Sequence, residues 1–157
     1  MMGRMKAALS GFATLALVLA TGAGRATTNA QQTWQADIQI RTLEITKTRT
    51  SLSARVVVYS ENDDEARDAR LLVLLPPGVG IDRLAPGCAA SASPSMVPSL
   101  RAAIGCDLGS IPDHGFREVV VSTTLPPNGL PRRFGVFTWS GTPDPVPGNN
   151  YAERAVP

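Results

Sequence analysis

The stretch Leu52-Ser53-Ala54-Arg55-Val56-Val57-Val58-Tyr59 decides the fold class of this chain. The apolar residues Leu52, Ala54, Val56 and Val58 alternate with Ser53, Arg55 and Tyr59. Alternation of this kind is typical of an antiparallel strand with one face on the core and the other in solvent. The stretch therefore predicts a half-buried β-strand.

The preceding segment alternates in the same way but changes phase. Ile38 and Ile40 share one face, and Leu43 and Ile45 share the other, so the pattern slips by one residue near Arg41 or Thr42. A one-residue slip in a period of two marks a bulge or a strand that crosses between sheets.

Further short strand-like segments follow, separated by turn signals such as Pro76-Pro77-Gly78. A Ser- and Pro-rich loop is expected over residues 85–101, with one helical turn around residues 98–104. The predicted strands are Ala69–Leu75, Ile104–Leu108, Phe116–Thr124, Phe134–Trp139 and Tyr151–Val156. About seven strands without an amphipathic helix indicate an all-β antiparallel sandwich.

An export signal is predicted at the N-terminus. Arg4 and Lys6 precede an apolar run over residues 7–20, which is too short to span a bilayer as a helix, and small residues follow it. Residues 1–26 are therefore predicted to be a signal peptide cleaved after Ala26, with Ala23 and Ala30 as alternative sites. We expect residues 27–36 to form a flexible leader and residues 37–157 the domain.

The predicted cleavage changes the charge of the chain. Three of its 15 basic residues, Arg4, Lys6 and Arg25, lie in the signal, which leaves 12 against 13 acidic residues. A nearly neutral protein has no electrostatic reason to bind nucleic acid or an anionic membrane. No cysteine stands at the cleavage boundary for lipid attachment, so no membrane anchor is expected after cleavage.

Cys88 and Cys106 are the two cysteines of the chain. In an oxidising compartment, an even pair is most economically explained as one disulfide. Thioredoxin-like chemistry needs Cys-x-x-Cys and structural zinc about four ligands, so a redox or metal-binding pair is disfavoured. A link of this span contributes about 3 kcal/mol in the chain-entropy model.

The acidic residues Asp63, Asp64, Glu65 and Asp68 are a candidate calcium site. Calcium takes six to eight oxygen ligands, and these side chains offer several. The Asp-x-Asp-x-Asp-Gly spacing of calcium loops is missing, however, so a solvated connection between strands is favoured. The carboxylate pair of a glycoside hydrolase would have to come from the same residues.

His114 is the single histidine, so any Ser-His-Asp or Cys-His mechanism would have to use it. It stands in the turn-forming segment Pro112–Gly115, and no serine occupies a Gly-x-Ser-x-Gly elbow. We expect an exposed turn residue and no enzymatic activity. The segment Asp144–Asn150, DPVPGNN, is likewise explained by turn chemistry in preference to ligand binding.

The aromatic strand Phe134–Trp139 has two faces. Phe137 and Trp139 share the one expected in the core, and Phe134 and Val136 share the outward one. Outward apolar side chains beside arginines make a contact patch, although packing at a sheet edge is the favoured explanation. The candidate patch consists of Arg132, Arg133, Phe134 and Val136.

Several segments, by their composition and their order along the chain, resemble the bacterial conserved-repeat surface domain catalogued as domain of unknown function number eleven. The likeness spans about residues 36–156. Its carriers are Asn62, Leu75–Val79 (LPPGV), Cys88, Cys106–Gly109 (CDLG), Gly115 and Asp144–Asn150. The resemblance implies an immunoglobulin-like sandwich used in stalk or adhesive modules, without catalytic residues. A single copy makes a poor stalk, which favours binding over spacing.

The sequence therefore predicts an immunoglobulin-like antiparallel β-sandwich of about seven strands with one disulfide. We expect it to mediate protein contacts in the periplasm or outside the cell, with no cofactor and an envelope or extracellular protein as partner. Three alternatives remain open: a carbohydrate- or calcium-binding module, a small hydrolase built on the acidic turn, and a purely structural spacer.

Overall fold

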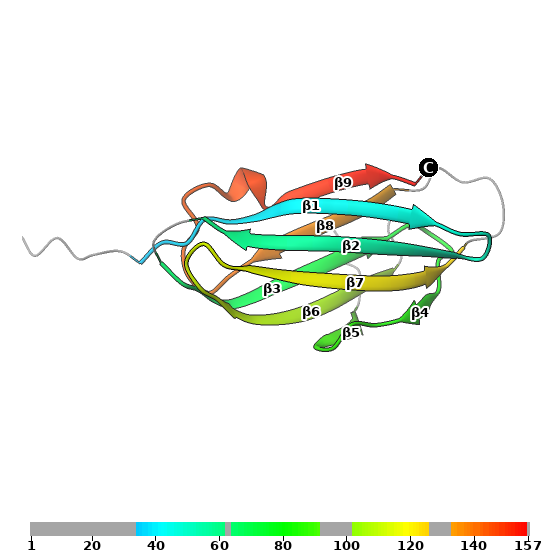
Figure 1. Ribbon diagram of the computed structural model, residues 1–157, viewed down its shortest axis with the longest axis horizontal. Helices are drawn as coiled ribbons and strands as arrows, with labels where there is room; N and C mark the ends of the chain where they lie inside the picture. Colours follow the sequence, from blue (N-terminus) through cyan, green and yellow to red (C-terminus); the bar gives the residue numbers. More distant parts are fainter. Residues whose placement is uncertain (1–33, 62–63, 92–101, 126–132, 157) are drawn as a thin grey trace, which may run out of the picture. The chain divides into compact units, whose positions relative to one another are not determined.

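The computed structural model describes residues 34–61, 64–91, 102–125 and 133–156. These residues form nine β-strands and one short 3-10 helix (Figure 1). The elements are β1 (Ile38–Lys47), β2 (Ser51–Ser60), β3 (Ala66–Leu75), β4 (Ile81–Arg83), β5 (Cys88–Ser91), β6 (Ala102–Ile111), β7 (Phe116–Thr124), β8 (Arg133–Trp139), η1 (Pro147–Asn149) and β9 (Tyr151–Ala155).

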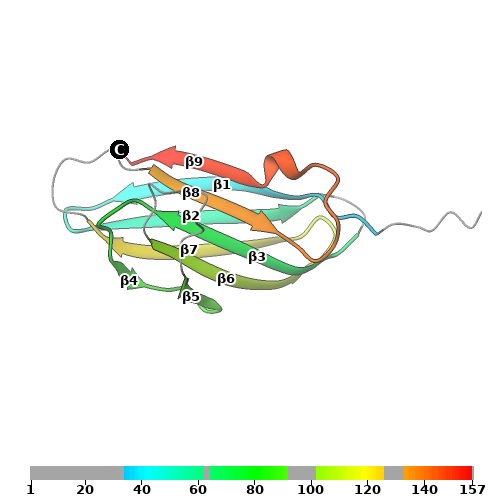
Figure 2. The ribbon, with the colours of Figure 1, turned by 180° about the vertical axis from the view of Figure 1, so that it is seen from behind.

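The strands form two antiparallel sheets that pack face to face. One sheet has the order β1-β2-β7-β4 and the other the order β5-β6-β3-β8-β9, as the opposite views in Figures 1 and 2 show. The first, second and seventh strands share one sheet, and the third, eighth and ninth share the other, as A, B, E and C, F, G do in immunoglobulin domains. The immunoglobulin-like sandwich is confirmed, with nine strands instead of about seven.

The phase change in β1 is a bulge. The ladder to β2 shifts at Arg41, which is the extra residue. Ile40 and Leu43 consequently stand opposite Val58 and Val56, and both of these valines are fully buried. Of the two predicted alternatives, a bulge and a strand that crosses between sheets, the structure has the bulge. It keeps both apolar pairs of β1 on the core side, whereas an uninterrupted strand would have turned the second pair outward.

The core lies between the sheets and is mostly aliphatic. The alternation predicted for β2 is confirmed, because Leu52, Ala54, Val56 and Val58 are all buried. Phe134 is the largest side chain that is fully buried. The other main contributors are Leu71, Val73 and Leu75 of β3, Ile104 and Cys106 of β6, Val119 and Val121 of β7, and Val136 of β8.

The folded domain begins before residue 37. The Ala36 side chain is buried, and its N–H donates to the Pro143 carbonyl over 3.0 Å. The Gln35 N–H donates to the Asp64 carboxylate, and the Arg67 guanidinium lies 5.2 Å from the centre of the Trp34 ring. The leader predicted for residues 27–36 therefore does not include residues 34–36, because these residues contact the domain.

The region predicted as a loop over residues 85–101 contains the short strand β5. The helical turn expected at residues 98–104 is wrong for residues 102–104, which belong to β6, and its earlier part lies outside the described residues. In the part of the chain that the structure describes, no helix is long and apolar enough to cross a membrane.

Candidate functional site

The faces of β8 are the reverse of those predicted. Phe134 and Val136 are fully buried, whereas the side chains of Phe137 and Trp139 are 39% and 40% exposed. The contact patch proposed around Phe134 and Val136 is therefore wrong. Of its two arginines, Arg133 is exposed and ion-paired to Glu153 (3.4 Å), and Arg132 lies outside the described residues.

Gly135 gives the physical reason for this orientation. A Cβ atom at Gly135 would lie 3.2 Å from the Tyr151 hydroxyl and 3.3 Å from Leu74 Cδ1 on the outer face. The outer face of β8 is crowded at position 135, so only a residue without a side chain fits there. Because side chains alternate along a strand, the neighbouring Phe134 faces the core, where its ring fills the space between the sheets.

An apolar row crosses the outer face of the five-stranded sheet. Five residues stand opposite one another on adjacent strands, from β9 at one edge to β5 at the other. We call them the outer row: Tyr151, Phe137, Leu72, Gly105 and Ala89. The Trp139 ring stacks on Phe137 with centroids 5.6 Å apart and an interplanar angle of 22°.

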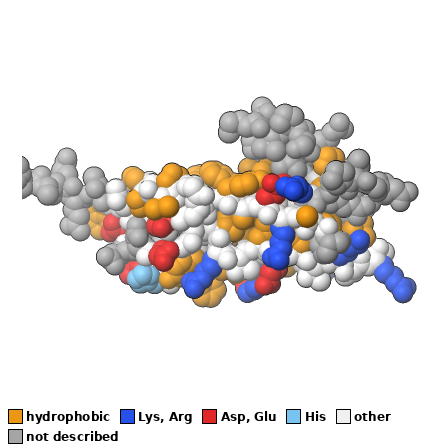
Figure 3. Space-filling view, turned by 90° about the horizontal axis from the view of Figure 1, so that it is seen from above, with side chains coloured by type: hydrophobic (Ala, Val, Ile, Leu, Met, Phe, Trp, Pro, Cys, Tyr) orange, Lys and Arg blue, Asp and Glu red, His pale blue; other side chains and the backbone are white. Residues whose placement is uncertain are grey.

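Three large rings are thus exposed on one sheet face, because Tyr151 is also 47% exposed. Figure 3 shows the molecule from above, with hydrophobic side chains in several groups between charged and polar ones. Single exposed apolar residues are ordinary, but a contiguous set of aromatic side chains is typical of a binding surface.

A shallow hollow of about 360 Å³ lies beside these rings. Trp139 forms one wall and Ala89 and Ala90 of β5 form the other, with Leu72 and Gly105 between them. A Cβ at Gly105 would make an ordinary contact of 3.7 Å with the Ser91 side chain. The glycine is therefore not required by close packing, and its missing side chain leaves the hollow open.

Two ion pairs border the outer row, one on each side, and the two charges of each pair are opposite. Arg70 lies 3.5 Å from Asp107 at the hollow, and Arg133 lies near Glu153 beside Gly135. These pairs are exposed and contribute little to stability. Burial, and then the Glu153 carboxylate, raise the pKa of Tyr151, so its phenol stays uncharged at neutral pH.

The outer face of the four-stranded sheet is different in character. The Arg55 guanidinium lies 2.7 Å from Glu118 and 3.2 Å from Glu44, and hydrogen bonds to these carboxylates raise the pKa of Arg55. Phe116 and Val120 are exposed on this sheet but have no ring stacked against them among the described residues. The charged face is typical of a solvated surface.

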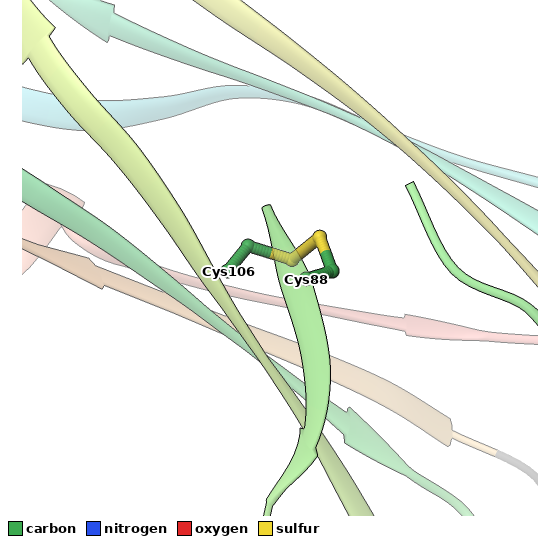
Figure 4. Close-up of a disulfide and its surroundings, with 2 residues drawn as sticks. All are labelled: Cys88 and Cys106. Atoms are coloured by element: carbon green, nitrogen blue, oxygen red, sulfur yellow. A yellow bond between two sulfur atoms is a disulfide. The ribbon is translucent and has the colours of Figure 1, made fainter. Parts of the chain in front are cut away.

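The disulfide supports one wall of the hollow. Cys88 and Cys106 are bonded to each other and stand directly opposite in the β5–β6 ladder, with Cα atoms 4.0 Å apart (Figure 4). The predicted pairing is confirmed. The bond joins neighbouring strands of one sheet, and so fixes the four-residue edge strand β5 beside the hollow.

The acidic turn does not assemble a metal site in the described residues. Asp64 accepts the Gln35 N–H, Glu65 lies 3.4 Å from Arg67, and Asp68 adopts a positive φ of 50° near Gly141; Asp63 lies outside them. Across residues 34–61, 64–91, 102–125 and 133–156, no three His, Cys, Asp or Glu side chains gather to hold a metal ion.

His114 lies in the tight turn between β6 and β7, with a φ of 51°. Its ring contacts the Tyr59 hydroxyl (3.2 Å) and Asp113 (3.4 Å), and the side chain is exposed. The turn itself is closed by a hydrogen bond from the Gly115 N–H to the Pro112 carbonyl. This is the exposed turn residue that the sequence predicts.

No family model matches this chain, and no curated protein matches it. Solved structures do match. One is an uncharacterized protein from Nocardia farcinica with an immunoglobulin-like fold, at 13% identity and a TM-score of 0.38, over 78% of this chain and 97% of that one. Another is the exo-β-N-acetylglucosaminidase of Vibrio harveyi, at 9% identity and a TM-score of 0.32, over 79% of this chain and 17% of that one.

Proposed function

We propose that this protein is an exported, non-enzymatic immunoglobulin-like module that binds another protein at the bacterial cell envelope or outside the cell. The single observation that carries the proposal is the outer row with its stacked Trp139. Aromatic anchors surrounded by polar groups are the usual composition of a protein-binding surface.

The size of the surface indicates what kind of complex it forms. Five strands about 4.8 Å apart and three outward positions per strand about 6.7 Å apart span roughly 400–500 Å² of this sheet face, in which ion pairs border the apolar outer row. Even this whole area is less than the roughly 800 Å² per partner of a standard stable interface. We therefore expect a reversible complex with modest affinity.

The face is a better docking surface than the sheet edges. The edge strand β9 has five residues, and its Arg154 side chain reaches across to the Leu43 carbonyl of β1 (2.8 Å). The edge strand β1 carries the bulge at Arg41. Short strands, charges and bulges are the features that protect edges from pairing with another chain, so strand addition is disfavoured.

The disulfide and the position of the single histidine both support a binding role. A disulfide indicates an oxidising environment, which agrees with the export signal predicted for residues 1–26. Immunoglobulin-like sandwiches serve mostly as interaction modules, and the single histidine lies in an exposed turn.

A second candidate is binding of a glycan, which the hollow favours. Trp139 offers an aromatic face on which the apolar side of a sugar ring stacks, and Arg70 and Asp107 offer hydrogen bonds to hydroxyl groups. The volume lies near the lower end of the range for small-molecule sites, roughly 300–1,000 Å³.

Affinity capture with matched variants tests the proposal. The mature, disulfide-intact protein is compared with Trp139→Ala and with Phe116→Ala, which removes an exposed ring from the other sheet. Envelope and culture fractions are applied, and retained molecules are identified by mass spectrometry. We expect a protein that is retained by the parent and Phe116→Ala and lost from Trp139→Ala. A retained glycan selects the second candidate, and an identical blank for all three proteins contradicts both and favours a spacer.

A further inference from the structure

The outer face of the five-stranded sheet has two unlike halves, one on each side of its central strand. β3 is central in the order β5-β6-β3-β8-β9, as Figure 2 shows. On one side, β8 and β9 carry the three exposed rings, Phe137, Trp139 and Tyr151. On the other side, β6 and β5 carry only Gly105 and Ala89 in the outer row, and the hollow lies there. One half of the face therefore protrudes and the other half is recessed.

A two-fold rotation about an axis along β3 exchanges the two halves. In a second copy that faces the first, β8 then lies over β6 and β9 lies over β5. Strands of two sheets that pack face to face stay aligned within about 30°, which this axis allows. The outer row sets Phe137 against Gly105 and Tyr151 against Ala89, with Leu72 of both copies at the axis. Each of these contacts occurs twice and joins a large side chain to a small one.

The row of outward side chains next to the outer row matches in its polar groups. Trp139 on β8, Arg70 on β3 and Asp107 on β6 stand opposite one another in the two ladders. The same rotation sets Trp139 of one copy against Asp107 of the other. An indole N–H is a donor and a carboxylate is an acceptor. The Trp139 side chain makes no hydrogen bond to the described residues, so its N–H is available for this contact.

The charges of this second row also suit a second copy. Arg70 lies 3.5 Å from Asp107 of its own chain. The rotation brings Asp107 of the other copy to the opposite side of Arg70, so two aspartates flank the two arginines near the axis and the four charges cancel. Complementary charges of this kind fix the register of a complex more than they raise its affinity.

We propose that the outer row, together with Trp139, Arg70 and Asp107, binds a second copy of this chain across a two-fold axis along β3. The inference rests on the proposed function, because it names a partner for the same surface. The dimer and a complex with another protein exclude each other. Self-association therefore covers the exposed rings when no other protein is bound.

The area of the face predicts a weak dimer. Roughly 400–500 Å² of each copy is covered, which totals about 800–1,000 Å² and is less than the roughly 1,200–2,000 Å² of stable interfaces. Interfaces of this size belong to transient complexes, so we expect a Kd of about 0.1 mM. At this Kd, about 15% of the chains are dimeric at about 10 µM and about 80% at about 1 mM.

Sedimentation velocity of the mature, disulfide-intact protein between about 10 µM and about 1 mM tests the proposal. We expect the weight-average mass to rise with concentration toward that of a dimer. No other protein is present in this measurement. A chain that stays monomeric here can still retain an envelope protein in the capture experiment, and a chain that self-associates can still retain none, so the two proposals fail separately.

Two variants, one from each half of the face, identify the surface. Phe137→Ala removes a ring and Gly105→Val fills the space opposite that ring, and each is expected to weaken self-association at least about 10-fold. The matched control Phe116→Ala removes an exposed ring from the other sheet and is expected to associate like the parent. Melting temperatures show whether each variant is folded.

A mixture of the two variants tests the axis itself. In a mixed dimer, one contact is the parental pair of Phe137 with Gly105, and the other sets the introduced valine against the introduced alanine. Each large side chain again meets a small one. Fluorescently labelled Phe137→Ala is therefore expected to bind unlabelled Gly105→Val about 10-fold more tightly than either variant binds itself.

Three results would overturn the proposal. One is a monomeric mass at every concentration up to about 1 mM. Another is unchanged self-association in both Phe137→Ala and Gly105→Val, which would place the contact on a different surface. The third is a mixture that associates no better than either variant alone, which would exclude the two-fold arrangement along β3.

Discussion

Phe137 and Trp139 stack on each other on the outside of the five-stranded sheet, 5.6 Å apart between ring centres. Successive outward positions of one strand bring them together, so no loop conformation is needed to form the pair. A rigid strand thus presents two rings, and Tyr151 of the neighbouring strand adds a third. Because the rings are already held by a strand, binding would cost less conformational entropy than it would for rings on a loop.

The two phenylalanines of β8 should differ sharply in their effect on stability. Phe134→Ala is expected to lower the free energy of unfolding by about 3–5 kcal/mol, since it empties a fully buried site. Phe137→Ala should cost less than about 1.5 kcal/mol, because that ring is 39% exposed. Urea unfolding of both variants measures the difference. Equal losses would contradict the assignment of the two faces.

Filling the hollow should abolish binding without damaging the fold. Gly105→Val places a β-branched side chain in the middle of β6, where strands favour such residues and where the first carbon makes only ordinary contacts. We expect an unchanged or raised melting temperature and at least a tenfold loss of affinity for the captured ligand. A variant that melts normally and binds normally would exclude the hollow from the site.

Removal of the disulfide should destabilise the domain and loosen β5. The bond spans 18 residues, and loss of this link costs about 3 kcal/mol in the chain-entropy model. Thermal unfolding of a Cys88→Ser, Cys106→Ser variant measures this cost, and amide hydrogen exchange reports on β5. Intact-mass analysis of the exported protein should show two hydrogens fewer than in the reduced form. Alkylatable thiols in that protein would contradict the pairing.

The ion pair between Arg55 and Glu118 should make the stability of the domain depend on pH. The hydrogen bond from Arg55 lowers the pKa of Glu118 below its ordinary value of 4.5. The pair therefore stabilises the fold above that value and loses its effect as the pH falls through the lower pKa of the folded state. Carboxyl NMR titration should show this lowered pKa, and Arg55→Gln should raise it. An identical Glu118 titration in both proteins would contradict the pairing.

Most strands of this protein could be predicted, because a strand with one buried face has apolar and polar residues in alternation. β2 shows this rule most clearly, because Leu52, Ala54, Val56 and Val58 are all buried, whereas β7 has Val119 and Val121 on the core face but Phe116 and Val120 exposed. The number of strands could not be predicted in the same way. β5 has only four residues, and it is held by β6 and the disulfide instead of by a buried face of its own.

The orientation of β8 shows the limit of a periodic pattern. Alternation separates Phe134 and Val136 from Phe137 and Trp139, but it does not say which pair is inside. That choice depends on a tertiary contact, the crowding of Gly135 by Tyr151 and Leu74. The residues assigned to the contact patch, Phe134 and Val136, belong to the buried face of this strand, and its exposed rings are Phe137 and Trp139.

The proposed binding surface consists of the outer row and Trp139. The most direct measurement is the equilibrium affinity of the captured partner, after purification, for the parent protein, Trp139→Ala and Phe116→Ala by calorimetry. We expect at least a tenfold loss for Trp139→Ala and a change of less than about twofold for Phe116→Ala, since ring anchors contribute most of the energy of such interfaces. Equal affinity of all three proteins, or a loss confined to Phe116→Ala, would contradict it.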